Sequence, residues 1–193
     1  EFDHADIFSD LSDILKQFHH AVRTVPANGN IIFHDGEKNI TDLIKMGCWS
    51  KTHQLGRKEN IQLLIEEGVI DFENQKFNIS DLPMHGKHNL SNAVIAMYAA
   101  SLHGISPKDS FLALKNSKGV KRRFETVFQN DHKIVIDDFA HHPTAISNTV
   151  QAATNYFPSK RILGIIELAS NTMSQGHHGE DLYESASALG KAY

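Results

Sequence analysis

The stretch Lys133-Ile-Val-Ile-Asp-Asp-Phe-Ala-His-His-Pro-Thr-Ala-Ile146 decides the fold of this chain. It begins with β-branched apolar residues at 134–136, a run that is typical of a buried strand. Two aspartates end the run. Pro143 then suits the first turn of a helix, because its φ is fixed and it has no N–H to leave unpaired. Ile146, Val150 and Ala153 follow with helical spacing. The stretch therefore predicts a strand, a sharp polar turn and a helix.

A strand followed directly by a helix indicates an α/β fold, and the turn between them carries two carboxylates and two imidazoles. These groups are Asp137, Asp138, His141 and His142. They come at the carboxyl end of the strand, which is where open α/β sheets place their ligands. We therefore interpret the turn as part of a functional site, and plain turn chemistry is the alternative.

Composition and charge exclude several function classes. The chain has 193 residues, a formal net charge of −4 and a single cysteine, Cys48. A protein with this net charge lacks the excess of basic residues that is typical of nucleic-acid-binding proteins, and one cysteine cannot form an internal disulfide. No apolar run approaches the roughly 20 residues of a membrane span, and no secretory signal is visible. We expect a cytoplasmic protein. Because the chain begins with Glu1, we also expect that its natural N-terminus has been removed.

The rest of the chain predicts alternating helices and strands. Before residue 120 we first expect a helix with apolar residues from Ile7 to Val22, a strand at 31–33 and a short helix that Gly47 ends. An antiparallel meander follows within 51–79. After it we expect an Ala-rich helix through Leu102 and a helix that Ser106 and Asp109 cap. The basic turn at 118–125 marks a boundary, which gives two parts, residues 1–120 and 121–193. After the opening stretch, 161–167 predicts another strand, and a final helix follows.

Three further groups carry chemistry that side-chain type and spacing suggest. Asp3 and His4 could ligate a cation, and helix capping is the alternative. Asn89 and Asn92 share a helix face, and carboxamides both donate and accept as a purine edge requires; N-capping is the alternative. The run 121–123, Lys-Arg-Arg, suits phosphate oxygens, and a solvated linker is the alternative.

Taken together, these groups resemble the Mur ligases, ATP-dependent amide-bond-forming ligases of bacterial cell-wall synthesis. The shared motifs are Asp3-His4, Gly86-x-His88-Asn89-x-x-Asn92, Gly-Val-Lys-Arg-Arg-Phe-Glu at 119–125, and Asp-Asp-Phe-Ala-His-His-Pro-Thr at 137–144. Their order and spacing together are more specific than any one of them. The resemblance implies an α/β fold: the second half of a central ATPase domain, with a mixed sheet, helices and a small meander, followed by the start of a Rossmann-like C-terminal domain.

The resemblance also implies ligands and site residues. ATP and Mg²⁺ are the expected cofactors. By similarity, His4 helps to bind magnesium and acts with Arg123 in catalysis. Asn89 and Asn92 meet the adenine, and His88 is a further cofactor-binding residue. Arg123 reaches the ATP phosphates or ribose, Asp138 and His141 hold the ribose side, and Ser170, Asn171 and Thr172 lie where the incoming peptide binds. Within the family, the chain resembles the branch that joins the murein tripeptide L-Ala-γ-D-Glu-meso-diaminopimelate to UDP-N-acetylmuramate through an acyl phosphate in cell-wall recycling.

Two departures from the family pattern limit these expectations. The Gly-Lys-Thr phosphate loop does not occur in these residues, so we expect the chain to be inactive alone. Leu168-Ala169 stands where the recycling branch commonly has Pro-Arg, which leaves peptide specificity open. A cut sheet also favours self-association.

Three alternative functions remain open from sequence. One is the family's L-alanine-adding activity, and another is a non-catalytic nucleotide-binding module. The third is a metal-dependent hydrolase that uses His4, His141, His142 and an aspartate, although no chelating spacing such as His-x-x-x-His is present.

Overall fold

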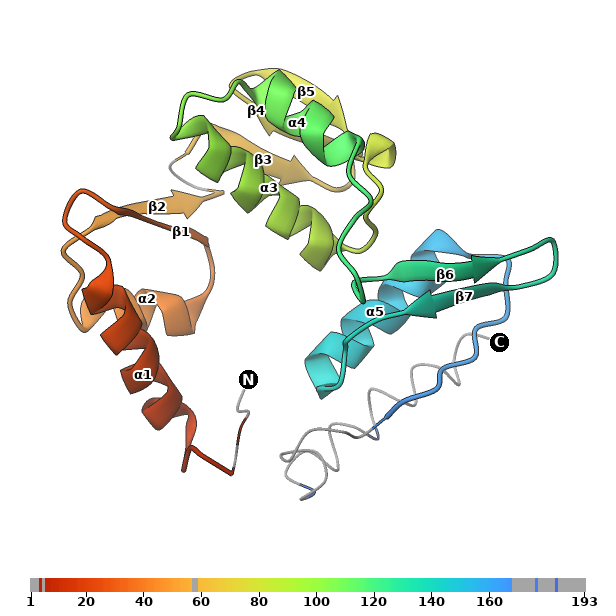
Figure 1. Ribbon diagram of the computed structural model, residues 1–193, viewed down its shortest axis with the longest axis horizontal. Helices are drawn as coiled ribbons and strands as arrows, with labels where there is room; N and C mark the ends of the chain where they lie inside the picture. The colour runs from red at the N-terminus through yellow and green to blue at the C-terminus, as the bar shows by residue number, and fades with distance from the viewer. Residues whose placement is uncertain (1–3, 5, 57–58, 168–175, 177–182, 184–193) are drawn as a thin grey trace. The chain divides into compact units, whose positions relative to one another are not determined.

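The computed structural model describes residues 4, 6–56, 59–167, 176 and 183 (Figure 1). The chain divides into two compact units. We call the unit made of Phe2–Asp81 and Ser91–Ala113 the N-terminal unit, and the unit that contains Leu82–Leu90 and the chain from Leu114 onward the C-terminal unit. The predicted domain limits, residues 1–120 and 121–193, stay a prediction.

The N-terminal unit begins with two helices and two parallel strands. These are α1 (Leu11–Thr24), β1 (Asn30–His34), α2 (Lys38–Lys45) and β2 (Lys51–Leu55). The predicted strand and short helix are confirmed. Asp10 caps α1 by accepting a hydrogen bond from the Asp13 N–H at 2.9 Å, so the helix starts later than the apolar pattern from Ile7 predicted. Strand β2 pairs in parallel with β1 and precedes the strands of the predicted meander.

The predicted meander is confirmed over β3 (Ile61–Leu64), β4 (Val69–Phe72) and β5 (Gln75–Asn78), which pair antiparallel in that order. A short 3₁₀ turn, η1 (Ile79–Asp81), follows, and then the helices α3 (Lys87–Ser101) and α4 (Pro107–Lys115). Ser106 Oγ accepts from the Asp109 N–H at 3.1 Å and donates to the Asp109 carboxylate at 2.7 Å, which confirms the predicted capping pair at the start of α4.

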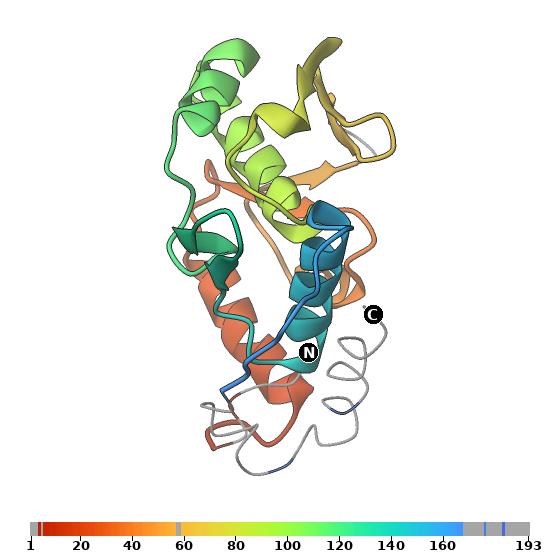
Figure 2. The ribbon, with the colours of Figure 1, turned by 90° about the vertical axis from the view of Figure 1, so that its right-hand side faces the viewer.

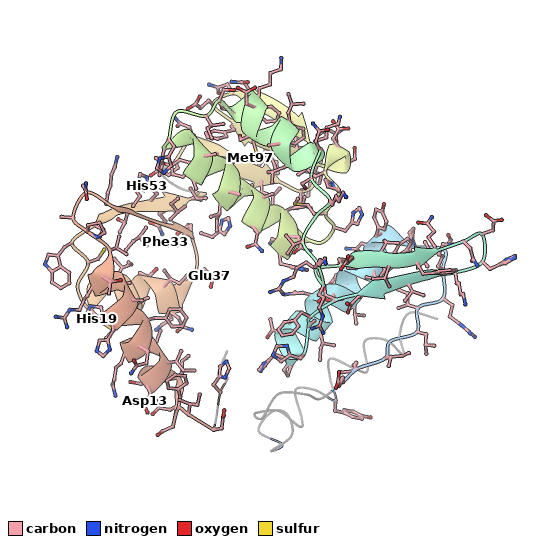
Figure 3. All side chains as sticks on the ribbon, in the orientation of Figure 1. Asp13, His19, Phe33, Glu37, His53 and Met97 are labelled. Carbon is pink, nitrogen blue, oxygen red and sulfur yellow. The ribbon has the colours of Figure 1, made fainter. Side chains whose placement is uncertain are left out.

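Helices α3 and α4 cover one side of the meander, as Figures 1 and 2 both show. The Phe72 and Tyr98 rings lie 6.3 Å apart between β4 and α3, and Phe77 stacks on Phe111 of α4 at 4.8 Å. Met97, labelled in Figure 3, is fully buried. Burial of these apolar side chains at about 25 cal/mol per Å² makes this contact the core of the unit.

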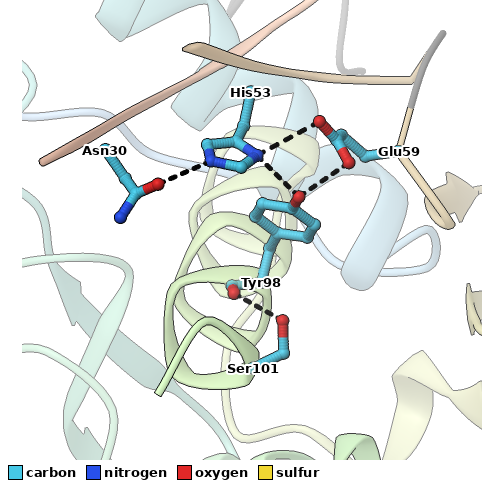
Figure 4. A network of polar contacts seen from close by, with 5 residues as sticks. All are labelled: Asn30, His53, Glu59, Tyr98 and Ser101. Carbon is cyan, nitrogen blue, oxygen red and sulfur yellow. Dashed lines mark hydrogen bonds and ion pairs between the residues drawn. The ribbon is translucent and has the colours of Figure 1, made fainter. Parts of the chain in front are cut away.

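A buried polar network joins β1, β2 and α3 within the same unit (Figure 4). His53 on β2 is 2% exposed, and its Nε2 donates to Asn30 Oδ1 at 2.8 Å. The Tyr98 hydroxyl donates to Glu59 Oε2 at 2.6 Å and lies 2.8 Å from His53 Nδ1. Burial, this hydrogen bond and the Glu59 charge raise the pKa of Tyr98. Ser101 Oγ donates to the Tyr98 carbonyl at 2.7 Å, which completes the network.

The C-terminal unit contains a hairpin and one described helix. Strand β6 (Glu125–Gln129) pairs antiparallel with β7 (Ile134–Asp137), with an irregularity between Thr126 and Phe128. Helix α5 (Pro143–Tyr156) has Pro143 in its first turn and runs behind the hairpin in Figure 1. The strand, turn and helix that the opening stretch predicted are therefore confirmed.

The predicted strand at 161–167 was wrong, because the chain is irregular there. A strand needs a neighbour for its N–H and C=O groups, and no described residues pair with this segment. Leu163 and Ile165 are accordingly 81% and 93% exposed. The predicted final helix lies outside the described residues.

Together the strands and helices form a mixed α/β fold with a small antiparallel meander, as predicted. None of the helices in the described part of the chain is both long enough and apolar enough to cross a membrane.

Candidate functional site

The basic turn before β6 has an unusual backbone. Arg122 and Phe124 have φ angles of 57° and 56°, in the left-handed region that side chains other than glycine rarely adopt. Such a conformation costs of order 1–3 kcal/mol per residue and persists only where the surroundings hold it. Arg123 lies between these two residues, so its position depends on whatever fixes the turn.

Four hydrogen bonds fix the turn. The Phe124 N–H donates to Asp138 Oδ2 at 2.8 Å, and the Phe139 N–H donates to the Arg122 carbonyl at 2.8 Å. The Arg122 N–H donates to the Glu125 carboxylate at 2.9 Å, and the Arg123 N–H donates to the Val120 carbonyl at 3.2 Å. Two of these bonds come from the residues that follow β7, which joins the basic turn to the polar turn.

The Asp138 carboxylate connects three pieces of chain. Besides Phe124, it binds the Ala140 N–H at 2.8 Å and the Thr149 hydroxyl of α5 at 3.2 Å, both on Oδ1. An ionised carboxylate has about four acceptor positions, two on each oxygen. Oδ1 therefore has both positions filled, and the described residues leave one position on Oδ2. Any hydroxyl of a ligand that Asp138 binds has to reach that position.

The two arginines of the turn lie near one aromatic ring. The Arg122 guanidinium lies 4.7 Å from the Phe139 centroid, and its Nε lies 3.6 Å from Asp137 Oδ2. The Arg123 guanidinium lies 6.0 Å from the same centroid. Among the described residues no carboxylate lies within ion-pair distance of Arg123, so this exposed cation is available to an anionic ligand.

The start of α3 lies against the same region. Gly86 has a φ of 87°, and a Cβ there would lie 2.9 Å from His88 Cε1 and 3.1 Å from the Ala152 Cβ of α5. His88 is half-buried. Burial lowers its pKa, the Asp138 charge opposes that shift, and Arg123 lowers the pKa further. The imidazole is therefore neutral at pH 7, with one donor and one acceptor nitrogen.

An aromatic cluster anchors the Phe124 side chain, which is 5% exposed. The His85 ring lies 5.7 Å from the Phe124 ring and 3.8 Å from the Tyr156 ring, and burial lowers the pKa of His85. The basic turn is thus fixed by its backbone and by this side chain.

The structure brings Arg123, Asp138, His88 and Asn89 into the C-terminal unit. Asn89 is buried, and its Nδ2 donates to the His85 carbonyl at 2.8 Å, which leaves its other N–H and its Oδ1. Asn92 lies one turn further along α3 and is exposed. Both residues lie inside the helix, and the alternative of N-capping was wrong.

The other predicted site residues are His141, His4 and the run 170–172. His141 Nδ1 donates to the Phe139 carbonyl at 2.7 Å, and its Nε2 takes no part in that bond. The His4 carbonyl accepts from the N–H groups of Ile7 and Phe8, both at 2.9 Å, so His4 closes a turn before α1 and does not cap the helix. Ser170, Asn171 and Thr172 lie outside the described residues.

Magnesium prefers oxygen ligands in an octahedral arrangement. Within the residues that the structure describes, no three His, Cys, Asp or Glu side chains gather into a group that could hold a metal ion. His4 is exposed. The described residues therefore do not form a complete magnesium site.

Sequence reasoning missed Thr149, His85 and Tyr156. Thr149 lies 11 residues after Asp138 and faces it only because α5 folds back after the polar turn. No local pattern indicates that contact, although a carboxylate at a strand end with a helix behind it is a reason to search that helix for a hydroxyl.

Comparison with known proteins identifies what the chain is similar to. Residues 122–190 match the model of the Mur ligase, glutamate ligase domain. The chain is 38% identical over its whole length to the UDP-N-acetylmuramate–L-alanyl-γ-D-glutamyl-meso-2,6-diaminoheptandioate ligase of Escherichia coli K12, of which it covers 43%. It is 34% identical over 99% of its length to a UDP-N-acetylmuramate–L-alanine ligase of Christiangramia forsetii, of which it covers 42%.

A solved structure agrees with these sequence matches. The murein peptide ligase Mpl from Psychrobacter arcticus 273-4 superimposes with a TM-score of 0.65 at 34% identity, over 94% of this chain and 40% of that protein. The chain thus spans about two fifths of the length of the relatives that it matches.

Proposed function

This chain belongs to the Mur ligase family, and we propose that it forms part of an ATP-dependent ligase of cell-wall recycling. The proposed reaction joins the tripeptide L-Ala-γ-D-Glu-meso-diaminopimelate to UDP-N-acetylmuramate in the cytoplasm. The similarity to named peptide ligases supports this substrate pair. The observation that carries the proposal is the basic turn, in which Asp138 fixes the backbone beside Arg123, an exposed cation with no carboxylate partner among the described residues.

Such a turn suits a nucleotide. Arg123 offers a planar fork of donors to phosphate oxygens or to the ribose. The remaining acceptor position of Asp138 suits a ribose hydroxyl, and the His88 and His141 imidazoles lie in the same unit. Asn89 retains one N–H and its carbonyl, and Asn92 is exposed; we propose that this pair meets the adenine edge.

The proposed chemistry has two steps. A muramate carboxylate oxygen attacks the γ-phosphorus of ATP, the bond to the β-phosphate oxygen breaks, and ADP leaves. The peptide amine then attacks the acyl carbon, phosphate leaves with the bonding pair, and the amine loses a proton. A carboxylate is a poor electrophile, so the first step makes the second possible. Catalysis of this kind is chiefly positioning and electrostatic stabilisation, and Arg123 offsets the charge that gathers between carboxylate and phosphate.

Magnesium, when bound, neutralises phosphate charge in reactions of this class. We propose a single contact from His4 to that ion and assign no step to it, because the described residues form no complete site. Ser170, Asn171 and Thr172 remain proposed peptide contacts.

A second candidate is the addition of L-alanine to the same nucleotide sugar. The 34% identity to an L-alanine ligase supports it, and the two activities differ only in the incoming amine. A direct comparison of the two amine substrates separates them.

The test of the site uses the full-length gene product, with ADP release as the measurement. Arg123→Ala is expected to lower kcat/KM for ATP by about 100-fold or more, because it removes a cation from a transition state that gathers negative charge. Lys133→Ala is the matched control: this cation of the same unit lies 5.4 Å from the Phe128 ring at the far end of the hairpin. It is expected to change kcat/KM less than twofold. Equal activities of the two variants would contradict the proposed site.

A further inference from the structure

Thr149 on α5 is connected to the basic turn through one carboxylate, that of Asp138. Its hydroxyl donates to Asp138 Oδ1 at 3.2 Å, and the other oxygen of the same carboxylate accepts from the Phe124 N–H at 2.8 Å. A carboxylate is planar and rigid. Fixing Oδ1 therefore also fixes where Oδ2 lies, and with it the N–H that follows Arg123 in the chain.

The turn needs such support because two of its residues are in the left-handed region, Arg122 at 57° and Phe124 at 56°. Strain of this kind persists only where several contacts hold it. On one side the Arg122 carbonyl accepts from the Phe139 N–H at 2.8 Å. On the other side the contacts are the Asp138 carboxylate and the buried Phe124 ring.

Among the residues that the structure describes, Oδ1 accepts from two partners, the Ala140 N–H and the Thr149 hydroxyl. The Ala140 bond joins residues two apart and lies within the polar turn. The Thr149 bond is the one that ties the carboxylate to α5, which is a rigid element. Without that hydroxyl, Asp138 Oδ1 keeps its hydrogen bond to the Ala140 N–H and loses its hydrogen bond to α5.

We propose that Thr149 and Asp138 form a brace that positions Arg123 for the transferred phosphate, with Thr149 as a positioning residue of the ligase reaction. This inference rests on the proposed function, because the position of Arg123 affects the reaction only if Arg123 binds the transferred phosphate. It adds to that function a residue on α5 which no motif marks.

The experiment compares three α5 variants of the full-length gene product. Thr149→Val keeps the shape and removes the hydroxyl. Thr149→Ser keeps the hydroxyl. Thr154→Val is the matched control, because the Thr154 hydroxyl donates to the Val150 carbonyl of its own helix at 3.0 Å. We expect Thr149→Val to lower kcat/KM for ATP about three- to tenfold, as the loss of one hydrogen bond of typical net strength predicts. Thr149→Ser and Thr154→Val are expected to stay within twofold of the wild type.

A double-mutant cycle separates positioning from a general loss of structure. If Thr149 acts through the Arg123 guanidinium, Thr149→Val has no further effect once Arg123 is alanine. Effects of the two substitutions that multiply would overturn the proposal, and so would a Thr149→Val enzyme with wild-type kinetics.

Amide hydrogen exchange supplies a readout that does not depend on the reaction. Exchange at the Phe124 N–H is expected to accelerate in Thr149→Val and to stay unchanged in Thr154→Val. If Arg123→Ala leaves turnover intact, the proposed role of Arg123 has failed. In that case the brace is judged by exchange alone: acceleration at Phe124 supports it, and unchanged exchange overturns it.

Discussion

The Phe124 N–H donates to Asp138 Oδ2 at 2.8 Å across 14 residues of sequence. This bond joins two motifs that look separate in the sequence, the basic turn at 118–125 and the polar turn at 137–144. Because the bond comes from the backbone, it requires the carboxylate at 138 and tolerates many side chains at 124. The two motifs therefore form one structural unit that presents Arg123.

Gly86 is expected to be the most sensitive glycine of the C-terminal unit. A Cβ there meets His88 Cε1 at 2.9 Å and the Ala152 Cβ at 3.1 Å, and its φ of 87° already disfavours a side chain. Gly104→Ala has a similar backbone cost at φ 79° and meets nothing within 4 Å, so it is the matched control. We expect Gly86→Ala to lower the free energy of unfolding by about 1–3 kcal/mol more than Gly104→Ala, as overpacking predicts.

Denaturant unfolding of both variants of the chain checks this expectation. Equal losses of stability would show that the space between His88 and Ala152 can expand at no cost, and would contradict the packing described for the start of α3.

His85 is expected to make the chain sensitive to acid. Burial lowers its pKa in the folded state, so below the unfolded value of about 6.5 the unfolded chain binds more protons than the folded chain. Stability that is present above that pH is then lost as the pH falls. In His85→Phe, which retains a ring against Tyr156, the free energy of unfolding should decline less between pH 7 and pH 5 than in the wild type.

The measurement is the difference in unfolding free energy between wild type and His85→Phe at each pH, with pH 8 as the baseline where both are uncharged at this position. A difference that stays constant from pH 8 to pH 5 would contradict a lowered His85 pKa in the folded state.

Tyr98 is expected to stabilise the N-terminal unit through its hydroxyl. Tyr98→Phe removes the hydrogen bond to Glu59 Oε2 and the contact with His53 Nδ1, and should cost about 1–3 kcal/mol. Because the pKa of Tyr98 is raised in the folded state, this contribution is fully present below the unfolded pKa of about 10 and is lost as the pH rises above it. The stability gap between wild type and Tyr98→Phe should therefore narrow above pH 10.

Thermal unfolding at pH 7 and above pH 10 measures this gap. Tyr156→Phe is the control for loss of a hydroxyl at neutral pH, because Tyr156 is 51% exposed. Equal effects of the two substitutions at pH 7 would contradict the stabilising network.

The elements that could be predicted from sequence are those whose cause is local. Ile134–Asp137 and the helix from Pro143 follow from β-branched residues and from a proline in the first turn. The capping pair of Ser106 and Asp109 involves residues three apart. In each case the sequence window contains every group that determines the structure.

The parts that could not be predicted depend on distant partners. The sequence of Lys51–Leu55 does not indicate whether this strand pairs with β1 or with the meander. The structure shows that it pairs in parallel with β1. The segment 161–167 has a strand-like composition but no described neighbour to bind. The bond from Thr149 to Asp138 likewise forms only once the polar turn has folded α5 back towards Asp138.

The reaction itself is the sharpest test. The full-length gene product is incubated with ATP, magnesium and UDP-N-acetylmuramate, and either the tripeptide L-Ala-γ-D-Glu-meso-diaminopimelate or L-alanine, and the nucleotide products are identified by mass. We predict a UDP-N-acetylmuramoyl tripeptide with one ADP released per amide bond, and a kcat/KM for the tripeptide about 100-fold or more above that for L-alanine. A preference for L-alanine, or no ATP-dependent amide formation with either amine, would contradict the proposed function.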